Sequence, residues 1–510
     1  MELTVWAFLL SLAFYPGWFG FLAWFSLIRP FIIISRLTGR KAFGAAYFYA
    51  VCFNIFSLYW VAMVTPPGTV GAVLIVSLYY AVVLTMISKL YRMKRLVGFV
   101  AAPFLWVGME YFRTLTQFAF PWSDLGYSQS YYLYILQIVS VISVHGLSFL
   151  IVAVNVLLWQ TLRKDLIAER RLTALFSSMA VVALLVAYGW VVMPRFPLPG
   201  KTDVAILQGS VPIDVKWSPG NLDHTMSIYD SLAQSVADTG LALCIWPETA
   251  VPCYLTHDYA CRGEISQIVR ATGTYHLLGA LSARRVDGEL RHFNSCFQVD
   301  PEGNVSKPYD KVKLVPFSEQ VPYQEALPFL RRDVIMEYLT FIKTYDVQFW
   351  SDFFPGDSLM LFEIPSTEYG VLICFESTFP EYSREMIRRG AGFLVGITND
   401  TWFGSSVGIH MHSRIFITRA VENRSWAVRA ANSGLSYIVD DYGRIRDKLE
   451  VNEVAALRGK IDLVSDYSVF TRYGDVVGWL SFLMLLVTIL ILALLWLLHK
   501  TGSIKPSRSS

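Results

Sequence analysis

The sequence contains little charge for its 510 residues. Asp, Glu, Lys and Arg make up 16% of it, well below the roughly 25% of ordinary soluble domains, whereas 54% is hydrophobic. The net charge of +3 is small and scattered, so it does not favour nucleic acid as a partner. This composition predicts lipid as the solvent for part of the chain and leaves room for one further domain of ordinary size.

Cysteine is also scarce, with six residues and no CxxC pair, which disfavours a structural zinc site and a thioredoxin-like motif. Only Cys253 and Cys261 are close enough to suggest a local disulfide, and that pattern is weak. The amino terminus, MELTVWAFLL, lacks the basic segment of a signal peptide. We therefore expect it to be retained as a membrane segment.

Long runs without charge mark the expected membrane spans, because a helix needs about 20 mostly apolar residues to cross a bilayer. The first run, from Glu2 to Arg29, is interrupted at residues 15–17 and gives two short helices or one long span. The second, from Lys41 to Lys89, is split into two spans by residues 65–68. The remaining expected spans are Leu96–Gln117, Tyr131–Leu162, Leu172–Met193 and Val476–Leu498.

Lysine and arginine predict the orientation of these spans, since basic loops stay in the cytoplasm. The loops after the second, fourth and sixth helices and the C-terminal tail are rich in Lys and Arg, whereas the alternate loops at residues 65–69 and 118–130 have none. The pattern predicts a membrane domain of seven helices over residues 1–195, an extracytoplasmic domain over residues 201–470 and a last transmembrane helix over residues 476–498.

Two charged residues, Glu110 and Arg113, lie one turn apart near the predicted outer membrane face. Charges within a bilayer are costly and often functional, but a pair at this spacing can neutralise itself, which is the interpretation we favour. His145, beside Gly146, is expected to mark a helix break and is given no chemical role.

From Lys201 onward, short apolar runs alternate with turn-forming residues. The strand-like runs are Val204–Leu207, Leu241–Trp246, His276–Leu281, Phe293–Val299, Gly370–Phe375, Phe393–Thr398 and Ser436–Asp440. Leu222–Thr239 and Ser413–Ala430 are long enough for helices, and Asp300–Asn304 is typical of a hairpin turn. The pattern predicts a layered α/β domain whose sheet mixes hairpins with crossovers.

Three polar residues stand at or just beyond the ends of strand-like runs. They are Glu248 in LALCIWPETA, Lys311 in YDKVKLVPFSEQVP and Cys374 in YGVLICFESTFP. Ligands of open α/β sheets bind beyond the carboxyl ends of strands, so the three form a candidate nucleophilic site. The carboxylate would take the thiol proton, and the ammonium would stabilise the thiolate and an oxyanion. Taken singly, they are equally typical of a buried core cysteine, a turn-capping glutamate and a surface lysine.

The sequence segments around these residues resemble the nitrilase superfamily, which has a triad of Glu, Lys and Cys in this chain order. Here the three residues lie within WPET, YDK and ICFE. The segments LVPFSEQVP, NDTWFG, RAVENRSWAVRAANSG and FPWSDLGYSQ are similar to its apolipoprotein N-acyltransferase branch. The resemblance covers essentially the whole chain. It implies a polytopic α-helical membrane domain joined to a nitrilase-like α-β-β-α sandwich, with Glu248, Lys311 and Cys374 as the catalytic residues.

The resemblance implies further site residues. Glu319, in PFSEQVP, matches a second glutamate that supports Lys311, and Glu376 matches another carboxylate beside the nucleophile. Trp217, in VKWSPG, matches a tryptophan at the substrate entrance, with ordinary packing as its alternative. Phe375 stands where a tyrosine is common, so a hydroxyl contact with substrate is lost there.

Other positions match or depart from the family without touching the triad. His412 falls where the family carries a histidine and is expected to be structural. Ser318 replaces a usual glycine, GIHMH stands for GPxQH, and NRS stands for GRP. These departures bear on substrate preference and leave the chemistry intact.

The family's activity implies transfer of a fatty acyl chain from a phospholipid, usually phosphatidylethanolamine, through a cysteine thioester to the amino terminus of a diacylglyceryl-cysteine apolipoprotein. It also implies a bacterial inner membrane location, with the catalytic domain on the periplasmic side, and neither a metal nor an organic cofactor. The alternatives are a membrane-tethered amidase acting on a small amide, a non-catalytic assembly protein and a transporter. The aromatic segment Tyr323–Phe354 predicts a lid at the membrane surface, or else a covered helix insert.

Overall fold

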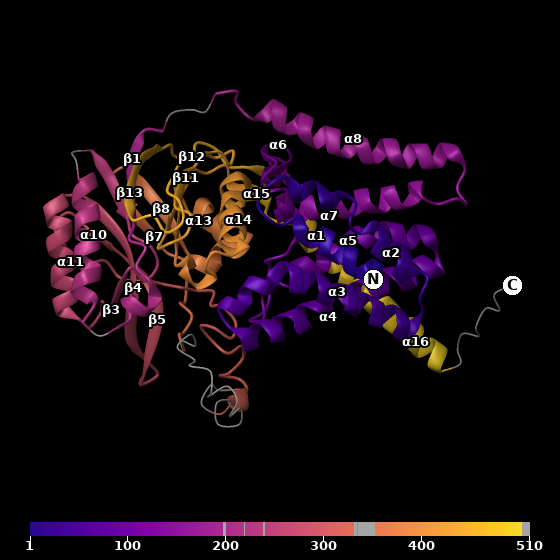
Figure 1. Cartoon of the computed structure of the whole chain (residues 1–510), viewed down its shortest axis with the longest axis horizontal. Helices are drawn as coiled ribbons and strands as arrows, with labels where there is room; N and C mark the ends of the chain where they lie inside the picture. Colours follow the sequence, from indigo (N-terminus) through magenta and orange to yellow (C-terminus); the bar gives the residue numbers. More distant parts are fainter. Residues whose placement is uncertain (197–199, 219, 238–239, 331–333, 335–351, 502–510) are drawn as a thin grey trace.

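The computed structural model describes residues 1–196, 200–218, 220–237, 240–330, 334 and 352–501. A bundle of long apolar helices lies at one end and a domain of sheets and helices at the other (Figure 1). The helices before residue 195 are α1 Glu2–Leu12, α2 Ile28–Ser35, α3 Gly39–Leu58, α4 Pro66–Met93, α5 Arg95–Phe112, α6 Leu133–Leu136, α7 Val139–Thr161 and α8 Ala168–Val192.

Turn-forming residues separate these helices at the two breaks that the sequence predicts, residues 15–17 and 65–68. The chain breaks at residues 15–17, and α4 begins at Pro66 because proline suits the first helical turn, where the missing N–H has no helical partner. The hydroxyl of Thr65 accepts a hydrogen bond from the Gly68 N–H at 3.2 Å and caps the helix.

Among the described residues, six helical segments are long and apolar enough to cross a membrane. They are Trp18–Ser35, Gly39–Met63, Gly68–Met93, Val139–Thr161, Ala168–Val192 and Val476–Lys500. The first of them lies within the charge-free run that starts at Glu2, and α1 is a shorter apolar helix beside it. The protein therefore has a polytopic helical membrane domain, and the exact division into seven spans and one stays a prediction.

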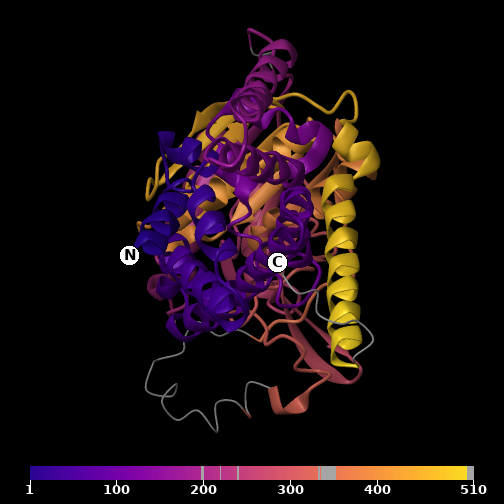
Figure 2. The ribbon, with the colours of Figure 1, turned by 90° about the vertical axis from the view of Figure 1, so that its right-hand side faces the viewer.

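The last helix, α16 Val476–Lys500, returns the chain to the membrane domain and packs along α5. Figure 2 shows it running down one edge of the bundle. A Cβ atom on Gly108 would lie 2.5 Å from the carbonyl oxygen of Ser481, so only glycine permits this close approach of the two backbones.

The membrane-domain charges have partners that the sequence pattern does not reveal. Arg113 forms a buried ion pair with Asp124, and Glu110 instead accepts hydrogen bonds from Trp106 Nε1 at 2.8 Å and from the N–H of Leu125 at 2.9 Å. The expectation that Glu110 and Arg113 neutralise each other is therefore wrong. Asp124 lies in a loop eleven residues beyond Arg113, and the guanidinium of Arg113 also donates to the hydroxyl of Tyr80 at 3.1 Å.

The α/β domain is built on two sheets in its described part. The first has the strand order β13-β1-β2-β4-β5-β6, with β3 paired to β4, and the second has the order β12-β11-β10-β9-β8-β7. The strands are β1 Thr202–Gln208, β2 Leu241–Ile245, β3 Val251–Tyr254, β4 Tyr275–Val286, β5 Glu289–Val299, β6 Tyr309–Asp310, β7 Leu361–Ile364, β8 Thr367–Ile373, β9 Leu394–Thr398, β10 Ala427–Ala431, β11 Tyr437–Val439, β12 Ile445–Lys448 and β13 Ala455–Ile461.

The two sheets pack face to face through apolar side chains, among them Val204, Ile206, Leu243, Val371, Ile373 and Ile397. Helices α10 Leu222–Val236 and α11 Tyr259–Thr272 cover the outer face of the first sheet. Helices α13 Pro380–Arg388 and α14 Val407–Asn423 cover the second sheet, and α14 also contacts α7 of the membrane domain (Figure 1). The layers confirm the α-β-β-α sandwich.

One predicted element of this domain is wrong in extent. The helix expected over residues 413–430 starts earlier and ends at Asn423, and residues 427–431 form the buried strand β10. Arg424 adopts a left-handed conformation with φ of 51° and ends the helix. All five residues of Ala427–Ala431 are buried, as in a strand that is covered on both faces.

Candidate active site

The three candidate catalytic residues meet at one edge of the sandwich. Glu248 follows β2, Lys311 follows β6, and Cys374 follows β8, so each stands just beyond the carboxyl end of a strand. All three line a single cavity of about 840 Å³. The structure thus brings Glu248, Lys311 and Cys374 together, as the sequence analysis predicts.

Lys311 lies between two carboxylates at the bottom of this site. Its side chain is 1% exposed, and its Nζ lies 2.8 Å from Oε1 of Glu319 and 3.4 Å from Oε1 of Glu248. Burial alone would lower the pKa of Lys311, but the charges of Glu319 and Glu248 outweigh it and raise the pKa above its ordinary value. The lysine therefore stays an ammonium ion, as an oxyanion-stabilising group requires.

Glu248 is held by two amide donors that the sequence analysis did not single out. Asn294 Nδ2 donates to its Oε1 at 2.7 Å, and the backbone N–H of Asn399 donates to its Oε2 at 2.8 Å. The amide of Asn294 also donates to Glu319 at 3.1 Å, so it fixes the two carboxylates relative to each other. An asparagine inside the strand-like run Phe293–Val299 was the signal that could have marked this role.

Cys374 occupies a sharp turn between β8 and the 3₁₀ turn η6 (Cys374–Thr378). Its φ of 51° places a non-glycine residue in the left-handed region, a strained conformation common at functional sites. Burial and the charge of Glu248 raise the pKa of the Cys374 thiol, and Lys311 opposes the shift. The resting thiol is therefore protonated near neutral pH, and a base must remove its proton before it can attack.

Glu376 connects the nucleophile turn to the lysine segment. One carboxylate oxygen accepts the N–H of Ile373 at 2.8 Å and the other accepts the N–H of Val312 at 2.6 Å. The hydroxyl of Tyr309 donates to both oxygens, at 2.9 and 3.0 Å. Burial raises the pKa of Glu376 to about 7, although the backbone donors oppose the shift. Glu376 therefore supports the turn at Cys374 and is not among the residues that line the cavity.

Replacing Glu376 by glutamine is expected to destabilise the fold by about 1–3 kcal/mol at pH 8, where the carboxyl is ionised. The new NH₂ group would face donors instead of acceptors and leave buried N–H groups unpaired. Unfolding of the detergent-solubilised protein by heat or denaturant measures the loss. Glu363→Gln, at an exposed position of β7, is the control, and equal stability of the two variants would contradict the role assigned to Glu376.

The cavity has an apolar wall built partly by the membrane domain. The aromatic residues that line it include Trp60, Phe120, Trp122, Phe375, Trp402 and Phe403. Trp122, in the loop before α6, stacks on Phe375 with ring centroids 6.4 Å apart and meets Trp60 edge-on at 4.8 Å. Phe375 is thus buried against the membrane domain, and residues of both domains form this aromatic wall.

Trp217 also lines this cavity, and its side chain is 45% exposed. Its role at the substrate entrance stays a prediction. The predicted lid, Tyr323–Phe354, lies largely outside the described residues. Within its described part, Asp352 and Phe353 line the cavity, and the N–H of Phe353 donates to the carbonyl of Glu319 at 2.9 Å.

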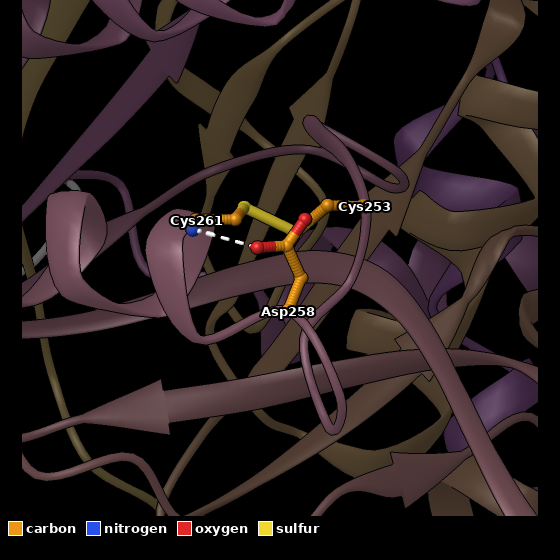
Figure 3. The surroundings of a disulfide bond; sticks show 3 residues. All are labelled: Cys253, Asp258 and Cys261. Carbon is orange, nitrogen blue, oxygen red and sulfur yellow. Dashed lines mark hydrogen bonds between the residues drawn. A yellow bond between two sulfur atoms is a disulfide. The ribbon is translucent and has the colours of Figure 1, made fainter.

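A disulfide joins Cys253 and Cys261, as the sequence weakly suggests. It ties the end of β3 to the first turn of α11, where Asp258 accepts the N–H of Cys261 at 3.0 Å and caps the helix (Figure 3). The neighbouring Tyr254 lines the cavity, so the disulfide braces one side of its wall.

The sandwich and the membrane bundle define a membrane-embedded protein of the nitrilase class. Residues 203–465 match the carbon-nitrogen hydrolase family, and residues 6–157 match the apolipoprotein N-acyltransferase N-terminal domain. The sequence is 33% identical to the apolipoprotein N-acyltransferase of Geobacter metallireducens, over 92% of this chain and 91% of that one. It is 28% identical to that of Chlorobaculum tepidum, over 89% of each. The chain therefore belongs to the apolipoprotein N-acyltransferase family.

The chain is also similar to solved structures. An amidase from a Nesterenkonia species is 18% identical and covers 55% of this chain and 95% of its own, with a TM-score of 0.38.

Proposed function

We propose that the protein transfers a fatty acyl chain from a phospholipid, through a thioester on Cys374, to the amino terminus of diacylglyceryl-cysteine apolipoproteins. The observation that carries this proposal is a nucleophile, a base and an ammonium in one cavity that the membrane-domain aromatics Trp60, Phe120 and Trp122 also line. Membership of the apolipoprotein N-acyltransferase family supports the same substrates.

The first half-reaction forms the thioester. Glu248 takes the Sγ–H proton, and the thiolate of Cys374 adds to an ester carbonyl of the phospholipid, with phosphatidylethanolamine as the expected donor. The ammonium of Lys311 stabilises the oxyanion. When the carbon–oxygen bond breaks, Glu248 returns the proton to the departing oxygen, and a lysophospholipid leaves.

The second half-reaction moves the chain to the acceptor. The α-amine of diacylglyceryl-cysteine adds to the thioester carbonyl, the carbon–sulfur bond breaks, and an amide forms. Glu248 carries the surplus amine proton back to the sulfur of Cys374. Because donor and acceptor use the one acyl-enzyme in turn, ping-pong kinetics follow.

The membrane domain gives this chemistry access to its substrates. Extracting an acyl chain from a bilayer costs about 0.8 kcal/mol per CH₂ group, so a site at the membrane surface avoids a large penalty. The basic loops support a location in the bacterial inner membrane with residues 201–470 on the periplasmic side. The Cys253–Cys261 disulfide fits that oxidising compartment.

Incubation of the purified protein with phosphatidylethanolamine and a synthetic diacylglyceryl lipopeptide tests the proposal. We expect a lipopeptide heavier by one acyl chain and an equal amount of lysophospholipid, measured by mass spectrometry. The same assay without lipopeptide should stop after one acyl group per protein. Failure of both products, together with hydrolysis of small amides in water, would replace this function with a membrane-tethered amidase.

A further inference from the structure

The backbone of the nucleophile is held by a histidine from another element. The carbonyl oxygen of Cys374 accepts a hydrogen bond from Ser377 Oγ at 2.7 Å, and it lies 3.1 Å from Nε2 of His412 on α14. Because a carbonyl oxygen only accepts, Nε2 of His412 is the donor in that contact. These two bonds orient the peptide that follows the strained Cα of Cys374.

His412 is itself fixed by two buried charges. Its Nδ1 lies 3.0 Å from Oδ1 of Asp400 and 3.0 Å from a guanidinium nitrogen of Arg429, and the side chains of all three residues are at most 2% exposed. Arg429 pairs with Asp400 at 2.8 Å. Burial would raise the pKa of Asp400, but Arg429 and His412 outweigh this effect and hold the pKa well below its ordinary value. The carboxylate at the centre of the cluster therefore stays ionised.

The same carboxylate reaches the thiol side of the nucleophile. Thr398, the last residue of β9, lies beside the thiol of Cys374, and its hydroxyl donates to Oδ1 of Asp400 at 3.0 Å. Between these two residues stands Asn399, whose N–H donates to Glu248. The segment 398–400 therefore reaches three parts of the site. Thr398 lies beside the sulfur of Cys374, Asn399 donates to Glu248, and Asp400 holds His412 against the carbonyl of Cys374.

We propose that Asp400, His412 and Arg429 form a buried positioning cluster that sets Cys374 in register with Glu248, the base for acylation, and with the Lys311 ammonium, on which the reactivity of the thiol depends. His412 is the member that transmits this register to the backbone of the nucleophile, so it is a positioning residue for acyl-enzyme formation. This inference rests on the proposed function for its substrate, but the positioning itself concerns the thiol and can be measured without lipid.

Two variants of similar volume isolate the hydrogen bond from the packing of the imidazole. His412→Gln keeps an N–H donor near the Cys374 carbonyl, whereas His412→Met fills the space and removes the donor. We expect His412→Met to lower the rate of single-turnover acyl-enzyme formation at least about tenfold with little change in the half-saturating phospholipid concentration. His412→Gln should stay within about threefold of the unaltered protein.

A second measurement uses no lipid. Iodoacetamide modification of Cys374 in the full-length protein, located by peptide mass spectrometry, should slow in His412→Met and recover in His412→Gln, while both variants melt close to the unaltered protein. Equal rates in all three proteins would overturn the proposal, and so would equal losses in the two variants. If the unaltered protein forms no acyl-enzyme from phospholipid, the proposed function fails, but the order of the alkylation rates still decides the role of His412.

Discussion

Replacing Cys374 by alanine is expected to abolish both acyl-enzyme formation and transfer, a loss of at least about 10⁴-fold in turnover. The sulfur is the atom that bonds the acyl chain, and neither Glu248 nor Lys311 can substitute for it at the end of the cavity. Intact-protein mass spectrometry after incubation with phospholipid measures the result. The unaltered protein should gain one acyl mass, and Cys374→Ala should gain none.

Cys52→Ala is the matched control, because Cys52 is a free, partly buried cysteine on α3 and lies in the membrane domain. It should acquire the acyl mass at the normal rate. An acyl adduct that persists in Cys374→Ala, or that disappears in Cys52→Ala, would show that the thioester forms elsewhere. Normal lipopeptide acylation by Cys374→Ala would remove the covalent mechanism altogether.

The strand-like runs of the sequence mark the positions of Glu248 and Cys374, since neighbouring strand ends meet at one edge of a sandwich. Lys311 follows the two-residue strand β6, which no such run predicts, and its place in the triad came from the resemblance of YDK to the nitrilase superfamily. The support from Glu319 came from the resemblance alone. Its geometry, 2.8 Å from Lys311, depends on a loop conformation that no periodicity encodes.

The sequence could not predict the contacts between site residues that lie far apart in the chain. Asn294 reaches Glu248 across 46 positions of the chain, and Trp122 meets Phe375 across a domain boundary. Such pairs depend on how sheets and domains pack, which local propensity does not determine. The same limit explains Arg113, whose partner Asp124 belongs to a loop and not to its own helix.

Glu248→Gln is expected to lower the rate of acyl-enzyme formation by about 10²–10⁴-fold, since the lysophospholipid oxygen would leave without a proton. The same change should not slow alkylation of the thiol. The charge of Glu248 raises the pKa of Cys374 and the ammonium of Lys311 lowers it, so removing the carboxylate lowers the thiol pKa. At neutral pH the thiolate fraction then increases, and iodoacetamide should modify Cys374 at least as fast as in the unaltered protein.

These opposite responses separate proton transfer from electrostatic activation of the sulfur. Glu319 continues to pair with Lys311 in the variant and keeps the ammonium in place, so a lost lysine does not explain the slower chemistry. Glu289→Gln, at the exposed start of β5, changes the net charge equally and should alter neither rate. If Glu248→Gln slows alkylation and acylation by the same factor, Glu248 acts only by shaping the site around Cys374, and the proton-transfer role assigned to it is wrong.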